Sequence, residues 1–96
     1  ANTAEIDLHI GELVEDYYLL ENDQMLKIQL EYARKCLNEA IIQGISKIIF
    51  IHGVGQGILK SELIKELNKY QNIHYFDASM AKYGVGATEV YIGKRE

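Results

Sequence analysis

The sequence has no proline, no tryptophan and only one cysteine. A single cysteine, Cys36, cannot form a disulfide within the chain, and this usage is typical of a reducing compartment. We therefore expect a cytoplasmic protein. The apolar runs are also far shorter than the roughly 20 residues that a membrane-spanning helix needs. Their shortness argues against a membrane span, so we expect no membrane partner.

Basic residues are scarce, because ten Lys and Arg stand against 14 Asp and Glu and give a formal net charge of −4. Proteins that bind nucleic acid without sequence preference are usually basic, since much of their affinity comes from neutralising phosphates. The charge is uneven: the acids crowd residues 5–23, whereas residues 82–95 contain three bases and one acid. Composition thus excludes binding driven by overall charge but leaves room for a local basic patch.

The length and the balance of residue types predict one globular domain. A chain of 96 residues can build a single core without disulfides or metals. Its content of 48% hydrophobic and 25% charged residues is typical of globular proteins. The sequence starts at Ala1 without a methionine. We expect residues 1–96 to be one domain cut from a longer protein.

The stretch 47–60 organises the chain. It contains Ile48–Ile51, an unbroken β-branched and aromatic run that predicts a buried strand. The run stops at His52, after which three of five residues are glycine and an apolar pattern at helical spacing begins. A strand that turns through glycines into a helix exposes backbone N–H groups and a helix N-terminus, an arrangement that accepts phosphate. His52 would lie at the carboxyl end of the strand, where ligands of open α/β sheets bind.

Hydrophobic periodicity predicts six elements. Residues 5–10 alternate as a half-buried strand, with Asp7 and His9 on the same face. Apolar residues spaced by three and four predict a long helix, which Asn22 and Asp23 can cap. The order β-α-β-α-β-β predicts an α/β fold, a two-layer sandwich with a four-stranded mixed sheet. The predicted elements are strands at 5–10, 47–51, 72–77 and 87–92, and helices at 24–43 and 57–69.

Two segments are expected to lack long regular structure. Residues 12–23 are acidic and contain Tyr17 and Tyr18, so we expect a loop or a short helical piece there. The tyrosine pair would either pack locally or contact a partner protein. Residues 78–86 contain glycines that permit backbone shapes other residues resist, and we expect a loop.

Polar residues should meet at the carboxyl ends of the first two parallel strands. These are Asp7 with His9, His52 with its glycine turn, and Thr88 at the start of the last strand. Imidazole transfers protons near neutral pH and backbone N–H groups stabilise developing negative charge, a combination that suits phosphodiester cleavage. Each residue also has a structural interpretation. A strand-end histidine often serves the core, and Asp7 could simply orient His9 or cap a turn.

Several ligand classes are disfavoured. Gly57 is followed by Ile58 and Leu59, so the spacing of a phosphate-binding P-loop is absent, and the glycine spacing also fails the dinucleotide pattern. Two histidines and one aspartate could hold a divalent metal ion, but no close ligand pair or helix-spaced motif supports one. We therefore expect no cofactor and no metal site.

Three short motifs occur along the chain: Ile6-Asp7-Leu8-His9, then His52-Gly53-x-Gly55-x-Gly57-x-Leu59, then Gly84-x-Gly86-Ala87-Thr88. In this order, and at these element boundaries, they resemble the Smr (small MutS-related) domain over residues 4–93. The resemblance implies a fold similar to the C-terminal domain of bacterial translation initiation factor 3. It also implies nucleic-acid binding, with nicking or endonuclease activity on DNA or RNA in several members.

The resemblance also indicates site residues. It implies catalytic roles for Asp7, His9 and His52, in which His52 transfers a proton or contacts phosphate and Asp7 orients or activates. The glycine turn would hold the phosphate, and nearby bases would make the binding salt-sensitive. The candidate phosphate or nucleic-acid contacts are Gly53, Gly55, Gly57, Lys60, Lys82, Gly84, Gly86 and Thr88, with Lys94 and Arg95 as further bases.

An alternative function is a non-catalytic protein-interaction module of a larger protein. Three features favour it: Val54 in place of a lysine in the second motif, the negative net charge, and the acidic segment 12–23 with its tyrosines. Ile10 is a further departure from the family pattern, because it precedes the glycine that usually follows the first histidine. The acidic segment 12–23 is expected to be an insertion relative to that pattern and a surface for a protein partner. The sequence leaves open the choice between DNA and RNA, the metal dependence of cleavage and the oligomeric state.

Overall fold

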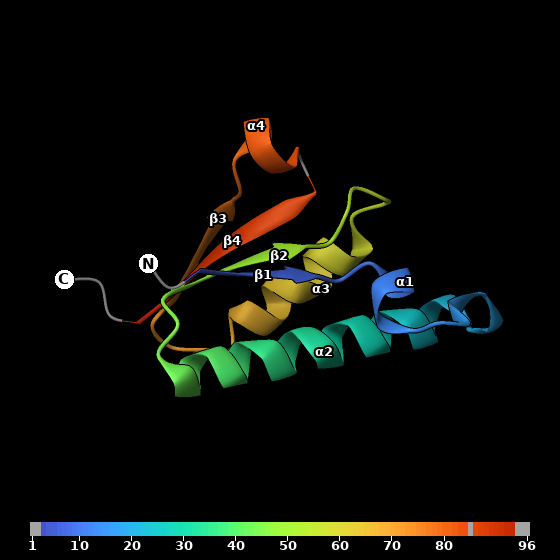
Figure 1. The fold of residues 1–96 in the computed structure, drawn as a ribbon, viewed down its shortest axis with the longest axis horizontal. Coiled ribbons are helices and arrows are strands. Elements are labelled where there is room, and N and C mark those ends of the chain that lie inside the picture. Colours follow the sequence, from blue (N-terminus) through green and yellow to red (C-terminus); the bar gives the residue numbers. More distant parts are fainter. Residues whose placement is uncertain (1–2, 85, 94–96) are drawn as a thin grey trace.

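The structure is a computed structural model that describes residues 3–84 and 86–93 (Figure 1). Short connections join its helices and strands. In chain order these are β1 (Thr3–Asp7), α1 (Ile10–Leu13), the 3-10 helix η1 (Tyr17–Leu19), α2 (Asn22–Gln43), β2 (Lys47–Ile51), α3 (Ile58–Leu67), β3 (Ile73–Asp77), α4 (Met80–Tyr83) and β4 (Ala87–Ile92).

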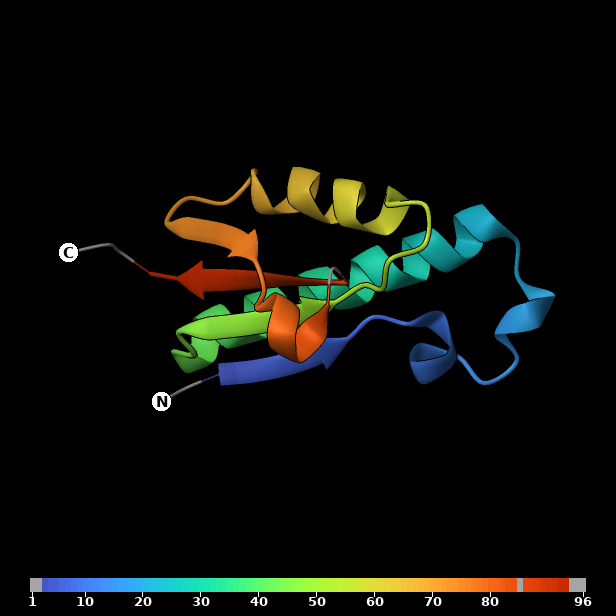
Figure 2. The ribbon, with the colours of Figure 1, turned by 90° about the horizontal axis from the view of Figure 1, so that it is seen from above.

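The strands form a four-stranded mixed sheet in the order β1-β2-β4-β3. β1 and β2 are parallel, and β4 runs antiparallel to both β2 and β3. Helices α2 and α3 pack on one face of the sheet, and the short α4 lies on the other side (Figures 1 and 2). The predicted fold class, a two-layer α/β sandwich on a mixed sheet, is confirmed. Among the described residues, no helix is long and apolar enough to cross a membrane.

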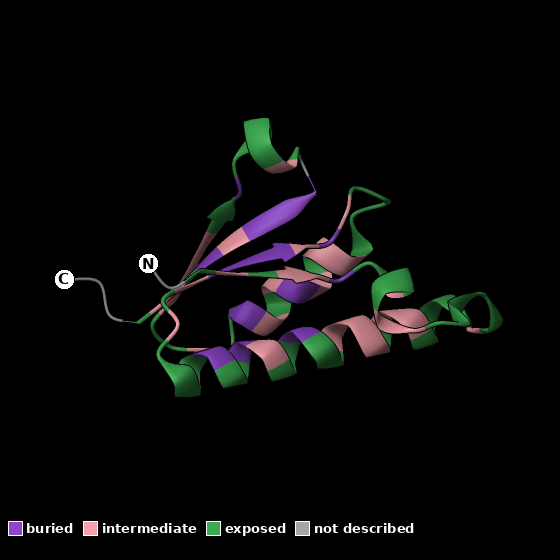
Figure 3. Ribbon diagram, in the orientation of Figure 1, coloured by how far each residue is buried: buried purple, intermediate pink, exposed green. Residues whose placement is uncertain are grey.

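The main core lies between the sheet and the two long helices. Strand alternation turns Ile48 and Phe50 toward the helices, where both are fully buried. Figure 3 shows the buried residues along β2, β4 and the inner sides of α2 and α3. A smaller cluster on the opposite face, around Ile49, packs beneath α4. The other residues of the main core are Leu8, Ala33, Leu37, Ala40, Leu63, Leu67 and Val90.

The start of α2 differs from the sequence prediction in its cap. Asn22 and Asp23 were expected to cap this helix, but the cap residue is Glu21. The Glu21 carboxylate accepts from the backbone at Gln24, and the Gln24 side chain accepts a hydrogen bond of 2.8 Å from the Glu21 N–H. This reciprocal pair satisfies two otherwise unpaired donors, so it replaces the predicted cap.

The first strand is shorter than predicted. Residues 5–10 were expected to form one strand with Ile10 facing the core, but β1 ends at Asp7, and Ile10 begins α1. The cause is the neighbouring strand, since Asp7 pairs with Ile51, the last residue of β2. Beyond that point β2 offers no further partner, and the chain turns away. The loop expected at 78–86 likewise contains a short helix, α4.

Candidate functional site

Three chain segments meet where β1 and β2 end. The Leu8 N–H donates to the Ile51 carbonyl over 2.8 Å and holds the chain after β1 against the end of β2. The backbone N–H groups of His52 and Gly53 both donate to the carbonyl of Gly86, at 2.9 Å each. The segments before α1, after β2 and before β4 are therefore fixed to one another by backbone hydrogen bonds.

Asp7 and His9 form a directly bonded pair. The backbone N–H of His9 donates to Oδ1 of Asp7 at 2.9 Å, and His9 Nδ1 donates to the same oxygen at 2.7 Å. Both side chains remain accessible, with 43% of Asp7 and 56% of His9 exposed. Because Nδ1 carries the proton that Asp7 accepts, Nε2 of a neutral His9 keeps its lone pair. The pair therefore holds a nitrogen with a free lone pair on a half-exposed ring.

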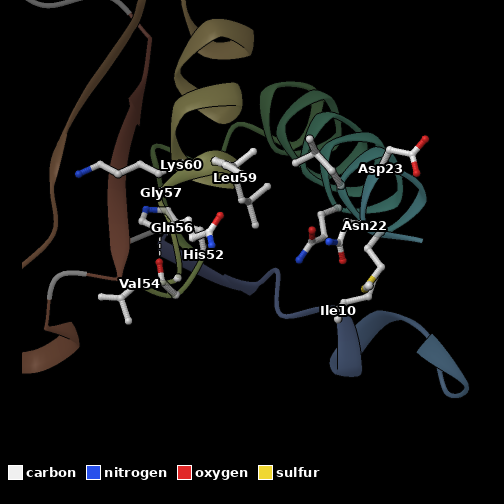
Figure 4. Close-up of a pocket in the computed structure, with 15 residues that line it drawn as sticks. Ile10, Asn22, Asp23, His52, Val54, Gln56, Gly57, Leu59 and Lys60 are labelled. Atoms are coloured by element: carbon white, nitrogen blue, oxygen red, sulfur yellow. Dashed lines mark hydrogen bonds between the residues drawn. The ribbon is translucent and has the colours of Figure 1, made fainter. Parts of the chain in front are cut away.

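His52 has a different environment, because it is only 8% exposed. Its Nδ1 lies 2.9 Å from the Gly53 carbonyl, which can only accept, so Nδ1 carries the proton (Figure 4). Its Nε2 lies 2.8 Å from the hydroxyl of Thr88, which then donates to the ring. Burial lowers the pKa of His52 below its ordinary value. His52 is thus a neutral imidazole with both nitrogens engaged inside the protein.

Gly53 lies between His9 and Gly86 at very short range. It has φ 77°, and a Cβ at this position would lie 2.8 Å from His9 Nε2. A Cβ on Gly86 would lie 3.0 Å from the Gly53 Cα atom. Any side chain would separate these segments, so the close approach of the imidazole to the turn requires glycine at both positions.

The glycine turn, residues 53–57, continues into α3. Gly55 and Gly57 also have positive φ, and Gly57 directly precedes the helix. Within the described residues, the N–H groups of Val54, Gly55 and Gln56 donate to no backbone carbonyl. These donors lie next to the N-terminus of α3, whose partial positive charge favours anions.

The candidate basic residues are distributed unevenly around this site. Lys60, in the first turn of α3, forms an ion pair of 2.9 Å with Asp77 at the end of β3. Lys82 lies on α4, with its Nζ 3.7 Å from the carboxylate of Glu5. Gly84 directly follows α4, and a Cβ added there would meet nothing within 4 Å. Lys94 and Arg95 lie outside the described residues.

The structure thus brings together most of the residues that the sequence selected, and it adds one. Asp7, His9, His52, Gly53, Gly86 and Thr88 form one contiguous cluster, whereas Lys82 and Gly84 belong to α4 on the other side of the sheet. The added residue is Gln29, whose Nε2 donates to the Leu8 carbonyl at 2.8 Å. No sequence signal marks it, because a helix glutamine is ordinarily a surface residue.

The donor set gives no independent support for a metal centre. Across residues 3–84 and 86–93, no three His, Cys, Asp or Glu side chains lie close enough together to hold a metal ion. The arrangement is instead a carboxylate–imidazole pair facing a turn with unpaired backbone donors. Such a site can bind an anion and transfer a proton beside it.

These features define a class of protein: a small α/β domain in which three motifs converge on a glycine turn. The sequence matches the Smr domain family over residues 26–93, and the chain belongs to that family. Among solved structures, it is similar to the Smr domain of Thermus thermophilus MutS2, with 27% sequence identity and a TM-score of 0.59. That similarity covers 95% of this chain and 99% of the other. No curated protein matches the sequence.

Proposed function

We propose that this Smr domain binds nucleic acid at the glycine turn and cleaves a phosphodiester bond next to it. The observation that carries the proposal is the position of the Asp7–His9 pair, whose free Nε2 faces Gly53 at the edge of the turn. Family membership supports it, because the resemblance to Smr domains implies nucleic-acid binding and, in several members, nicking.

In this proposal His9 is the proton-transfer residue. Asp7 orients its ring and stabilises the imidazolium that forms when Nε2 takes a proton. The proton would come from a water molecule or a ribose hydroxyl whose oxygen bonds to the phosphorus atom. The bond from phosphorus to the leaving ribose oxygen then breaks, and that oxygen takes up a proton from the imidazolium or from water. Proton transfer by a positioned side chain typically contributes about 10²- to 10⁴-fold to a rate.

His52 is proposed to position the turn. The sequence suggested it as a proton-transfer residue, but both its ring nitrogens have partners, Gly53 and Thr88. Its bond to the Gly53 carbonyl and its burial fix the first residue of the turn beneath His9. In this proposal Gly86 and Thr88 lie behind the turn, where Gly86 supports Gly53 and Thr88 supports His52.

Phosphate is proposed to bind the free N–H groups of the turn, with Lys60 nearby. Backbone donors next to a helix N-terminus hold phosphate without any lysine inside the motif, so Val54 does not remove the site. Lys60 can exchange its exposed partner Asp77 for a phosphate at small cost, because exposed ion pairs contribute about 0–1 kcal/mol.

The test is cleavage of end-labelled single-stranded RNA and of supercoiled DNA, with and without a chelator. We expect the wild-type domain to cut at least one of them and the His9→Ala variant to lose at least a hundredfold in rate. His74→Ala, on β3, is the matched histidine control. The proposal fails if His9→Ala cuts as fast as the wild type, or if the wild type leaves both substrates intact.

A second candidate function, protein interaction through residues 12–23, has one observation in its favour. Tyr18 and Leu19 on η1 are 71% and 74% exposed, an unusual position for large apolar side chains in an acidic segment. The test compares partner capture by the wild type with capture by a Tyr18→Ser, Leu19→Ser double variant. A partner that both proteins retain equally would exclude this surface.

A further inference from the structure

A depression of about 590 Å³ adjoins the glycine turn. One wall is formed by the turn and the first residues of α3, the other by the first turns of α2, and Ile10 lies at one end (Figure 4). His52 and Gly53 belong to its lining. The depression therefore opens directly beside the site proposed for phosphate.

Its walls are apolar on both sides. Leu26 of α2 and Leu59 of α3 line opposite walls, and both side chains are only partly buried. Met25 and Ile10 extend this lining toward α1. Two apolar walls with a gap between them suit a flat ring that can contact both faces, as ligand pockets commonly do.

Three amide side chains line the same depression: Asn22, Gln29 and Gln56. Gln29 is held in place because its Nε2 donates to the carbonyl of Leu8. In the part of the chain that the structure describes, the side-chain amides of Asn22 and Gln56 have no hydrogen-bond partner. A side-chain amide presents an N–H donor next to a carbonyl acceptor. The edge of a nucleobase can present an acceptor next to a donor, so the two can form a pair of hydrogen bonds.

The charged groups of the lining residues point away from the turn. Asp23 and Lys60 both direct their charged ends away from Asn22 and the turn (Figure 4). Lys60 is paired with Asp77, and His52 is neutral. The interior is therefore neutral, with apolar walls and amide edges, and it suits an uncharged polar ring better than a second phosphate.

We propose that this depression, the base pocket lined by Ile10, Asn22, Leu26, Gln29, Gln56 and Leu59, receives one unstacked nucleobase of a single-stranded nucleic acid. The inference rests on the proposed function, because it places the phosphate attached to that nucleotide on the glycine turn. A base within a duplex is paired and stacked, and taking it out costs a few kcal/mol, about a hundredfold in affinity. The pocket therefore selects single strands.

The first experiment separates the base from the phosphate. Mononucleotides and ribose 5-phosphate are added in turn to the ¹⁵N-labelled domain, and the NMR signals of the turn N–H groups and of the three side-chain amides are followed. We expect both probes to shift the turn signals, and only the mononucleotides to shift the side-chain amides of Asn22, Gln29 and Gln56.

Each outcome decides the proposal. If mononucleotides and ribose 5-phosphate shift the same signals and spare the amides, the base pocket is wrong while the phosphate site stands. If no probe shifts the turn and single-stranded oligonucleotides do not bind, the proposed function fails and the pocket with it. An aromatic amino-acid side chain binding here in place of bases would likewise overturn the proposal.

The second experiment uses variants. Asn22→Ala and Gln56→Ala should each weaken binding of a short single-stranded oligonucleotide about two- to tenfold, which is the effect of losing one hydrogen bond. Asn22→Ala, which lies outside the turn, should not change the affinity for ribose 5-phosphate. Gln43→Ala, which removes an exposed amide at the far end of α2, is the matched control. Equal oligonucleotide binding by all three variants and the wild type would overturn the pocket.

Discussion

The hydroxyl of Thr88 lies 2.8 Å from Nε2 of His52, and both residues are buried. Because Nδ1 donates to the Gly53 carbonyl, Thr88 supplies the proton that satisfies Nε2. This bond joins two motifs that lie 36 residues apart in the chain. It fixes the protonation of His52 and, through it, the first residue of the glycine turn.

Replacing Thr88 by valine should therefore destabilise the fold. The change keeps the side-chain shape but leaves the buried Nε2 without a donor, which costs about 1–3 kcal/mol. Urea unfolding of Thr88→Val measures the loss. Thr3→Val, the same change at an exposed strand position, should stay within about 0.5 kcal/mol of the wild type. Equal stability of the two variants would show that the hydroxyl contributes nothing.

The neutral state of His52 predicts a dependence of stability on pH. Burial holds the folded-state pKa of His52 below its ordinary value of 6.5, so the unfolded chain takes up this proton at a higher pH than the folded chain. The contribution to stability is complete above about pH 6.5 and is lost as the pH falls through the folded-state pKa. An NMR titration of the His52 ring, with urea unfolding at several pH values, tests this. A ring that titrates at or above 6.5 would contradict it.

Substitution of Gly53 by alanine should disturb the site beyond its effect on stability. Gly53 and Gly44 have nearly the same positive φ, 77° and 74°, so alanine should cost about 1–2 kcal/mol at each. Only at Gly53 would the new Cβ meet a neighbour, His9 Nε2 at 2.8 Å, whereas Gly44 has open space. We expect Gly53→Ala to lose at least tenfold in cleavage rate and Gly44→Ala to keep its rate under folding conditions. Similar rates for both would argue against the role of the close approach.

The Lys60–Asp77 ion pair predicts opposite effects of two variants on nucleic-acid affinity. Lys60→Ala should weaken binding and reduce the salt slope by about one, because one phosphate contact is lost. Asp77→Asn should strengthen binding, since it removes a negative charge and releases Lys60. Affinity measured over a range of salt concentrations tests both, with Lys69→Ala as the control for loss of an exposed lysine. Weaker binding by Asp77→Asn would contradict the role given to Lys60.

The strands next to the site could be predicted from sequence because their signal is local. β2 and β4 have the predicted bounds, 47–51 and 87–92, since unbroken or alternating β-branched runs define them. The end of β1 could not be predicted in this way. The alternation continues to Ile10, but pairing stops at Asp7 because β2 ends at Ile51. Strand ends therefore depend on the partner strand, which no local pattern contains.

The roles within the site were less predictable than their positions. The motifs indicated His9 and His52 equally, since a sequence pattern does not show which hydrogen-bond partners each side chain will have. The difference between them comes from tertiary contacts: Thr88 and Gly53 engage both nitrogens of His52, whereas Asp7 engages only one of His9. Gln29 and the depression beside it depend on how α2 packs against the turn, so no local sequence pattern indicates either.

The central claim is that His9 transfers the proton while His52 positions the turn, and chemical rescue tests it most directly. Single-turnover cleavage is measured for His9→Ala and for His52→Ala, each with and without imidazole added to the buffer. Imidazole should restore part of the rate of His9→Ala, because the His9 side chain is 56% exposed, and should leave the rate of His52→Ala unchanged. Rescue of His52→Ala together with no rescue of His9→Ala would contradict it.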